Sequence, residues 1–192
     1  MKTKNLGNKM TDSKPSILLL FPGPKYRLRA LFERRLEELS KHFQGTLITI
    51  SDEDESFQIG NFEMMAIGTD QPSSLNATLS MYRRAKVVAK EYADQGKPFK
   101  LVVAYDPLKV GLMAVVLSKQ LGCKLAVEVN GEFASDGNYL DYPSAFQRRF
   151  KKIMILSNAW LVLKFSSGAK LLHDKQLGPY RWAHNRPVMR IF

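Results

Sequence analysis

Two kinds of segment alternate along the chain. Short runs in which every residue is apolar are typical of strands buried on both faces, and they are separated by segments whose apolar residues recur every three or four positions, which is typical of amphipathic helices. The first apolar run ends at Pro22-Gly23-Pro24, and a helical pattern then continues to about Phe43. The expected strands cover residues 16–21, 46–50, 62–67, 100–105, 125–129, 159–165 and 187–192.

Helix-capping residues mark the helices between these strands. Ser73 or Ser74 is expected to cap a long helix to about Gln95, and Asp106-Pro107 opens a helix to about Leu121. A basic amphipathic segment covers 143–157, Ser166-Ser167 is expected to cap a helix to Gln176, and the acidic segment 51–56 is expected to be a loop. Strands that alternate with helices predict an α/β fold, a Rossmann-like parallel sheet of about six or seven strands with helices on both faces.

The fifth expected strand ends in Asn130-Gly131-Glu132, which has two interpretations. Asn-Gly is a strong hairpin-turn signal, because both residues tolerate positive φ. No alternating apolar pattern follows Gly131, so a returning strand is not expected. These residues are therefore expected at the carboxyl end of a parallel strand, where open α/β sheets bind ligands.

Length and composition indicate one domain, residues 15–192, preceded by a flexible basic tail over residues 1–14. Cys123 is the only cysteine, which excludes an intrachain disulfide or a cysteine zinc site and favours a reducing, cytoplasmic location. No apolar stretch approaches the roughly 20 residues of a membrane span, so the chain is expected to be soluble or to lie on the inner face of a membrane.

Positive charge is concentrated in the second half of the chain. The net charge is +11, and residues 97–192 carry 15 Lys and Arg against six Asp and Glu, a net charge of +9. Within the segment 146–156, cations alternate with phenylalanine and isoleucine: they are Arg148, Arg149, Lys151 and Lys152. This pattern suits an anionic membrane surface or nucleic-acid phosphates, and it is equally typical of a surface helix whose apolar face packs in the core.

Several polar residues follow or interrupt the expected strands. The loop Pro22–Lys25 precedes a helix, where backbone N–H groups can hold a phosphate, although a proline-stiffened turn explains it equally well. Asp106 suits a helix cap or a site residue, and Glu128 inside an apolar strand needs a cationic partner or a functional role. The motifs of dinucleotide-binding proteins, P-loop enzymes and serine hydrolases are absent. The three histidines lack metal-ligand spacing, so no metal, cofactor or catalytic residue is assigned.

The order of these segments resembles the N-terminal domain of GT-B glycosyltransferases, most closely the retaining, glycogen-synthase-like family 4. The resemblance covers nearly all of residues 16–192 and rests on the strand and Pro/Gly loop at the start, on "LVVAYDPLKVGLMAVVLSKQLGCKLAVEVNGE" and on "LVLKFSSGAKLLHDKQLG". Two positions depart from the family pattern: prolines flank Gly23 where two adjacent glycines are common, and Asn130 stands where many members have His.

The resemblance implies roles for particular residues. The domain would bind a saccharide or lipid-linked acceptor, and a C-terminal domain absent from this chain would bind the sugar nucleotide. The substrate-binding residues would lie in the cleft between the two domains: Gly23, Lys25, Asp106, Asn130, Gly131 and Glu132. The four cations of 148–152 would contact anionic lipid, and the chain alone would transfer no sugar.

Two other classes of function remain open. The first is a Rossmann-like binding module without activity, which would use the basic face for nucleic acid or another anionic partner, although nucleic acid is the less expected of the two. The second is a small phosphate-handling enzyme of flavodoxin-like shape. It lacks support because no acid, base and nucleophile converge in the sequence.

Overall fold

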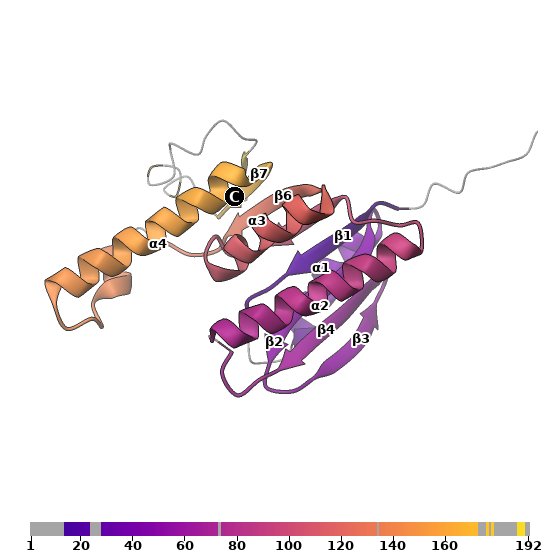
Figure 1. Cartoon of the computed structure of the whole chain (residues 1–192), viewed down its shortest axis with the longest axis horizontal. Coiled ribbons are helices and arrows are strands. Elements are labelled where there is room, and N and C mark those ends of the chain that lie inside the picture. Colours follow the sequence, from indigo (N-terminus) through magenta and orange to yellow (C-terminus); the bar gives the residue numbers. More distant parts are fainter. Residues whose placement is uncertain are drawn as a thin grey trace, which may run out of the picture.

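The protein is an α/β domain built on one mixed sheet (Figure 1). The computed structural model describes residues 14–23, 28–72, 74–133, 135–172, 176, 178 and 188–190, and only the backbone of 28–31 and 188–190. Within these residues, eight strands lie in the order β3-β4-β2-β1-β5-β6-β7-β8. Their bounds are β1 Ser16–Leu20, β2 Gln44–Ser51, β3 Glu55–Ile59, β4 Phe62–Gly68, β5 Leu101–Ala104, β6 Lys124–Val129, β7 Gly168–Leu171 and β8 Val188–Arg190.

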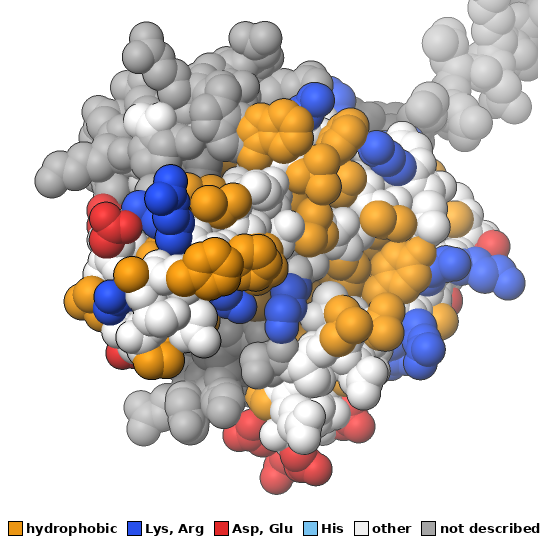
Figure 2. All heavy atoms as spheres, turned by 60° about the vertical axis from the view of Figure 1, so that its left-hand side comes forward, with side chains coloured by type: hydrophobic (Ala, Val, Ile, Leu, Met, Phe, Trp, Pro, Cys, Tyr) orange, Lys and Arg blue, Asp and Glu red, His pale blue; other side chains and the backbone are white. Residues whose placement is uncertain are grey.

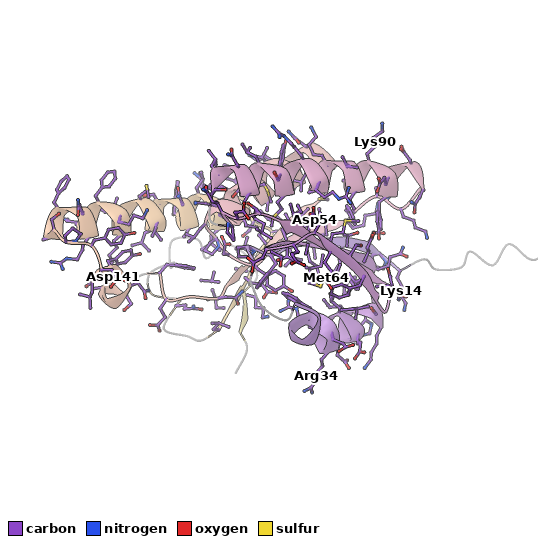
Figure 3. All side chains as sticks on the ribbon, turned by 90° about the horizontal axis from the view of Figure 1, so that it is seen from below. Lys14, Arg34, Asp54, Met64, Lys90 and Asp141 are labelled. Atoms are coloured by element: carbon purple, nitrogen blue, oxygen red, sulfur yellow. The ribbon has the colours of Figure 1, made fainter. Side chains whose placement is uncertain are left out.

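Helices cover both faces of this sheet. They are α1 Leu28–Ser40, α2 Leu75–Asp94, α3 Lys109–Leu121 and α4 Ala145–Phe165, with the short 3-10 helix η1 Asp136–Tyr139. Figure 3 places Arg34 of α1 and Lys90 of α2 on opposite sides of the sheet, with Met64 of β4 between them. The helix α4 extends beyond the sheet, and η1 lies beneath its first turns.

The central strands are apolar throughout because each contributes to two cores. In β1, Leu18 and Leu20 pack in the core beneath α2 and α3, whereas Ile17 and Leu19 pack in the core beneath α1. Successive side chains of a strand point to opposite faces, so a strand covered on both faces must be apolar at every position. The predicted doubly covered α/β sheet is confirmed.

The edge strand β3 was not expected. It pairs antiparallel with β4 around Gly60 and Asn61, so the predicted loop 51–56 is correct only for 52–54. The strand is hard to recognise because only Ile59 is buried in it, while polar residues such as Glu55 and Gln58 are exposed. An edge strand with one solvated face lacks the continuous apolar run that identified the central strands.

The segment 159–165 was predicted as a strand, and this is wrong: it forms the last third of α4. No Gly or Pro interrupts residues 145–165, so the helix capped by Ser144 continues to Phe165, with Ala159, Val162 and Leu163 buried at helical spacing. A short apolar run does not by itself distinguish a strand from the buried end of a helix.

The helix predicted from Ser166-Ser167 is also wrong at its start. Ser166 ends α4, and its hydroxyl donates to the carbonyl of Leu163 at 2.8 Å. Residues 168–171 then form β7, parallel to β6. The remainder of that predicted helix lies largely outside the described residues, whereas the final predicted strand is present as β8 over 188–190.

The helix predicted to begin at Pro107 begins two residues later, at Lys109, as α3. The helix predicted from Ser74 is confirmed: its hydroxyl accepts from the N–H of Ala77 at 3.0 Å at the start of α2.

Candidate functional site

Three predicted site loops meet at the carboxyl edge of the sheet. The strands β1, β5 and β6 are neighbours and run parallel, so the residues that follow them, Gly23, Asp106 and Asn130, leave the same edge. The side-chain amide of Asn130 donates to the carbonyl of Tyr105 at 2.9 Å, which ties the end of β6 to the end of β5. The predicted placement of Asn130-Gly131 at a strand end, and not in a hairpin, is therefore confirmed. Lys25 lies outside the described residues.

Gly23 occupies a backbone conformation that only glycine adopts easily. Its φ is +107°, and a Cβ atom at this position would lie 2.9 Å from the carbonyl oxygen of Ile50 in β2. The loop after β1 therefore passes directly against the end of β2. A close backbone approach is one reason for glycine here, and it holds with or without a bound phosphate.

Asp106 is half-buried at the turn between β5 and α3. Its Oδ1 accepts from the N–H of Leu108 at 2.6 Å, so the carboxylate stabilises the turn that leads into the helix. Burial raises the pKa of Asp106, and the backbone N–H groups of Leu108 and Gly111 act in the opposite direction. The prediction that Asp106 caps the helix is wrong, because the N-cap residue of α3 is Leu108, which has no side-chain cap, and Asp106 lies in the turn before it. Its place at a binding site stays a prediction.

The loop after β6 is held by a buried amide that the sequence did not identify. Gln176 donates through Nε2 to the carbonyls of Val129 (3.2 Å) and Gly131 (3.1 Å), and its Oε1 accepts from the N–H of Leu172 at 2.9 Å. Gln176 thus ties the ends of β6 and β7 together. Its position as the last residue of a predicted helix carried no sign of this role.

Polar side chains beyond this clamp face solvent. Asn130 and Glu132 are exposed, and the carbonyl of Glu132 accepts from the N–H of Ser135 at 3.0 Å and from the side-chain amide of Asn138. The edge therefore presents one amide and two carboxylates, those of Asp106 and Glu132, on loops that are fixed to the sheet. Such groups accept and donate hydrogen bonds to hydroxyl-rich ligands.

Glu128 lies beneath this edge, on the α1 face of the sheet. Its carboxylate is 6% exposed and receives both terminal nitrogens of Arg35, a bidentate ion pair, together with Lys170 Nζ at 3.1 Å. The interpretation that Glu128 pairs with neighbouring cations is confirmed. Arg35 also lies over the ring of Tyr105, with Cζ 4.6 Å from the centroid.

These charges shape the electrostatics of the α1 face. Burial opposes the charge of Arg35, but the hydrogen bond to Glu128 and the nearby charges raise the pKa of Arg35 overall. Burial raises the pKa of Tyr105 far above its ordinary value, so the phenol stays neutral. The ion pair borders a mostly apolar hollow of about 420 Å³ beside α1, lined by Leu39, Phe43 and Val103 among others.

The four cations of the basic segment lie elsewhere, on the first half of α4. Lys152 pairs with Asp136 of η1 at 2.6 Å, and Arg148, Arg149 and Lys152 border a hollow of about 520 Å³ between η1 and α4. The three buried residues of α4 are all in its last third. The interpretation of 143–157 as an ordinary surface helix with its apolar face in the core holds only at the end of the segment, where Leu156 packs against the core. Phe146, Phe150 and Ile153 are exposed.

The described part of the chain has neither of two further features. It contains no group of three or more His, Cys, Asp or Glu residues that could hold a metal ion. It also contains no helix long and apolar enough to cross a membrane.

No protein-family model and no curated protein matches the sequence. Solved structures match over most of the chain. TcCGT1 in complex with UDP has a TM-score of 0.54 at 15% identity, over 94% of this chain and 51% of that one. UGT2 from Phytolacca americana, without ligand, has a TM-score of 0.58 at 11% identity, over 93% of this chain and 52% of that one. UGT89C1 from Arabidopsis thaliana complexed with UDP has a TM-score of 0.51 at 11% identity, over 93% and 52%.

These structures are GT-B glycosyltransferases, and the likeness establishes a shared fold. The chain spans about half the length of each of them. The Rossmann-like half of a GT-B fold predicted from the sequence is confirmed.

Proposed function

We propose that residues 15–192 form the acceptor-side domain of a glycosyltransferase that transfers a sugar from a sugar nucleotide to a saccharide or lipid-linked acceptor. The observation that carries the proposal is the convergence of the loops after β1, β5 and β6 at one sheet edge. The domain shares its fold with about one half of the length of GT-B structures. Ligands of open α/β sheets bind at this edge. The retaining, glycogen-synthase-like family 4 is the group within that fold that we propose.

In this proposal the named residues bind and position substrates. Gly23 and Lys25 belong to the loop that faces the donor's phosphates and transferred sugar. Asp106, Asn130-Gly131 and Glu132 form the acceptor side of a cleft, where amide and carboxylate groups hydrogen-bond acceptor hydroxyls. No catalytic residue is assigned to this chain.

Sugar transfer then requires a donor-binding domain opposite this edge, and residues 1–192 alone are proposed to be inactive. The half-length match to the GT-B structures supports this division. A cytoplasmic location accompanies the proposal, since a single half-buried cysteine suits a reducing compartment.

Acceptor binding tests the proposal directly. We would titrate the isotope-labelled chain with a panel of mono- and disaccharides and follow backbone amide signals. A saccharide that shifts the signals of 23, 106 and 130–132 supports the proposal, and Asn130→Ala with Glu132→Ala should abolish the shifts. Glu37→Ala with Glu38→Ala on α1 is the matched control and should leave them unchanged. Absence of any saccharide effect at this edge, or turnover of a sugar nucleotide by the purified chain, contradicts it.

A binding module without enzymatic activity is the second candidate, favoured by the positive charge of the second half and by the cations on α4. Such a module would bind RNA or DNA with an affinity that falls steeply with salt. The same labelled chain titrated with single-stranded oligonucleotides distinguishes the two, because the signals that shift would then belong to α4 and not to the sheet edge.

A further inference from the structure

The first half of α4 exposes an apolar stripe that an ordinary helix of a globular domain would bury. Phe146 is 79% exposed and Phe150 is 61% exposed, and their rings stack with centroids 6.4 Å apart, one helical turn from each other. Ile153 continues the stripe at 56% exposure. Leu140, in the turn after η1, adds a further side chain that is 67% exposed. Scattered exposed apolar residues are normal, but a contiguous patch marks an interaction surface.

Cations surround this stripe, and α4 contains no acidic residue. Arg149 is exposed, Arg148 and Lys151 are half-buried, and Lys152 is bound to Asp136. Figure 2 turns this side of the molecule forward and shows hydrophobic side chains interspersed with Lys and Arg side chains across it. We refer to Leu140, Phe146, Phe150 and Ile153 with Arg148, Arg149, Lys151 and Lys152 as the α4 surface.

The shape of the molecule makes the α4 surface accessible to a flat partner. The helix extends beyond the sheet, and Asp141 lies at its far end beneath the first turns (Figure 3). A hollow of about 520 Å³ opens between η1 and α4. Its lining combines the cations Arg148, Arg149 and Lys152 with the apolar side chains of Leu140, Ile153 and Leu156, and its one carboxylate, that of Asp136, is paired with Lys152. An anionic headgroup entering this hollow would meet guanidinium and ammonium groups while its acyl chain meets aliphatic side chains.

We propose that the α4 surface binds the surface of an anionic lipid bilayer, with Phe146, Phe150 and Ile153 in the region between headgroups and acyl chains. Helices that lie in a membrane interface combine aromatic and aliphatic residues on one side with Lys and Arg around them, as this one does. The described helices are too short or too polar to span a bilayer, which leaves binding in the plane of the interface. The headgroup phosphates would occupy the hollow between η1 and α4.

Two other occupants fit the same surface less well. A second copy of the chain in a two-fold dimer would place each cation cluster against itself, and like charges across an interface cost several kcal/mol. Single-stranded nucleic acid would stack on Phe146 and Phe150, but the aliphatic part of the surface, Leu140 and Ile153, offers nothing to a base or a phosphate.

The inference extends the proposed function without depending on it. The chain runs directly from the loop at Asn130–Glu132 into η1 and then α4. Membrane binding would therefore hold the sheet edge close to the bilayer, where a lipid-linked acceptor is presented. If the chain binds lipid but no saccharide, the membrane proposal stands and the sugar-transfer proposal fails.

Vesicle co-sedimentation of the full chain tests the inference. We expect partition onto vesicles of phosphatidylcholine with phosphatidylglycerol and little onto phosphatidylcholine alone. Arg149→Glu with Lys151→Glu should weaken the partition by about tenfold or more, because each cation near an anionic surface contributes several-fold. The matched control, Arg83→Glu with Lys90→Glu on α2, changes the net charge by the same amount. Its partition should differ from that of the native chain by only about twofold, as expected from the change in net charge alone.

The apolar contribution has its own pair of variants. Phe146→Ser with Phe150→Ser should reduce partition by about tenfold or more, since burial of the two rings supplies most of the apolar gain. Val87→Ser with Val116→Ser, which are exposed on α2 and α3, should have no effect. Circular dichroism shows that each variant is folded. Equal partition onto both kinds of vesicle, or partition that neither pair of α4 variants reduces, overturns the proposal. The proposal is also overturned if the chain does not bind vesicles and the α4 variants instead lose dimer formation or oligonucleotide binding.

Discussion

Arg35 of α1 and Glu128 of β6 form a bidentate ion pair on the α1 face of the sheet, directly beneath the candidate site. Lys170 of β7 approaches the same carboxylate at 3.1 Å. One carboxylate therefore joins a helix and two strands that are far apart in the sequence. Removing a single partner leaves the other charges without compensation, and this costs more than the pair itself contributes.

Glu128→Gln should therefore destabilise the domain. The side chains of Arg35 and Lys170 are 35% and 21% exposed, so water relieves part of the penalty. We expect the free energy of unfolding to fall by about 2–4 kcal/mol, measured by urea denaturation. Glu38→Gln is the matched control, because Glu38 pairs with Lys41 on the solvent side of α1, where both side chains are exposed. Equal effects of the two substitutions would show that burial of the Glu128 pair is unimportant.

Asp106→Asn should change how stability depends on pH. Burial raises the pKa of Asp106 in the folded state, so its contribution to stability is fully present below the unfolded pKa and is lost as the pH rises through the folded pKa. Asparagine keeps the Oδ1 acceptor for Leu108 and does not ionise. The stability of the variant relative to the native chain should therefore increase as the pH rises from below the ordinary pKa of aspartate through the raised pKa of the folded state. Urea denaturation at several pH values measures this difference, and a constant or decreasing difference would contradict the assignment.

Gly23→Ala should destabilise the domain, because alanine suits neither the backbone conformation nor the space at this position. At φ +107° the added Cβ would lie 2.9 Å from the carbonyl oxygen of Ile50, so the residue meets both backbone strain and a backbone contact. We expect the free energy of unfolding to fall by about 2–3 kcal/mol. Gly96→Ala is the control, since its φ of +74° brings strain but nothing lies within 4 Å of its Cβ. Thermal denaturation compares the two, and a smaller effect at Gly23 than at Gly96 would show that the loop moves away from β2.

Gln176→Ala should loosen the loop after β6. The substitution leaves the carbonyls of Val129 and Gly131 and the N–H of Leu172 without their side-chain partner. We expect a loss of about 1–3 kcal/mol in the free energy of unfolding, with faster hydrogen exchange at the amides of 131, 132 and 172. Gln120→Ala removes an exposed amide that bonds the Tyr82 hydroxyl, and it should leave exchange near β6 unchanged. If exchange near Gly131 does not respond to loss of Gln176, the clamp does not hold the loop.

The strand–helix alternation could be predicted because it is written in local periodicity. The run 16–20 is apolar at every position, and burial of Leu18 and Leu19 on opposite faces is the reason. The boundary signals were local as well: Ser74 caps α2 through its own hydroxyl. The absence of a returning strand after Gly131 was sufficient to place Asn130 at a sheet edge.

Residues 159–171 were less predictable, because the same local sequence pattern suits either a strand or a helix. The apolar run 159–165 suits a strand or a buried helix, and the helix prevails because it continues from Ser144 without a break and packs Val162 against α3 near Gly111. The short strand β7 forms because β6 leaves an edge open for residues 168–171 to pair with, and no local propensity predicts that pairing.

By itself the sequence determined the α/β class, the cores on both faces of the sheet, the meeting of Gly23, Asp106 and Asn130 at one edge, and the excess of positive charge on α4. These properties depend on periodicity, capping and composition, which act over a few neighbouring residues. Only the tertiary structure decided that Glu128 pairs with Arg35 and Lys170, that Gln176 clamps the loop after β6, and that the apolar stripe of α4 faces solvent. The two sets of contacts join residues tens of positions apart, and the exposure of the stripe depends on which elements pack against α4. Both are fixed only once the sheet has formed.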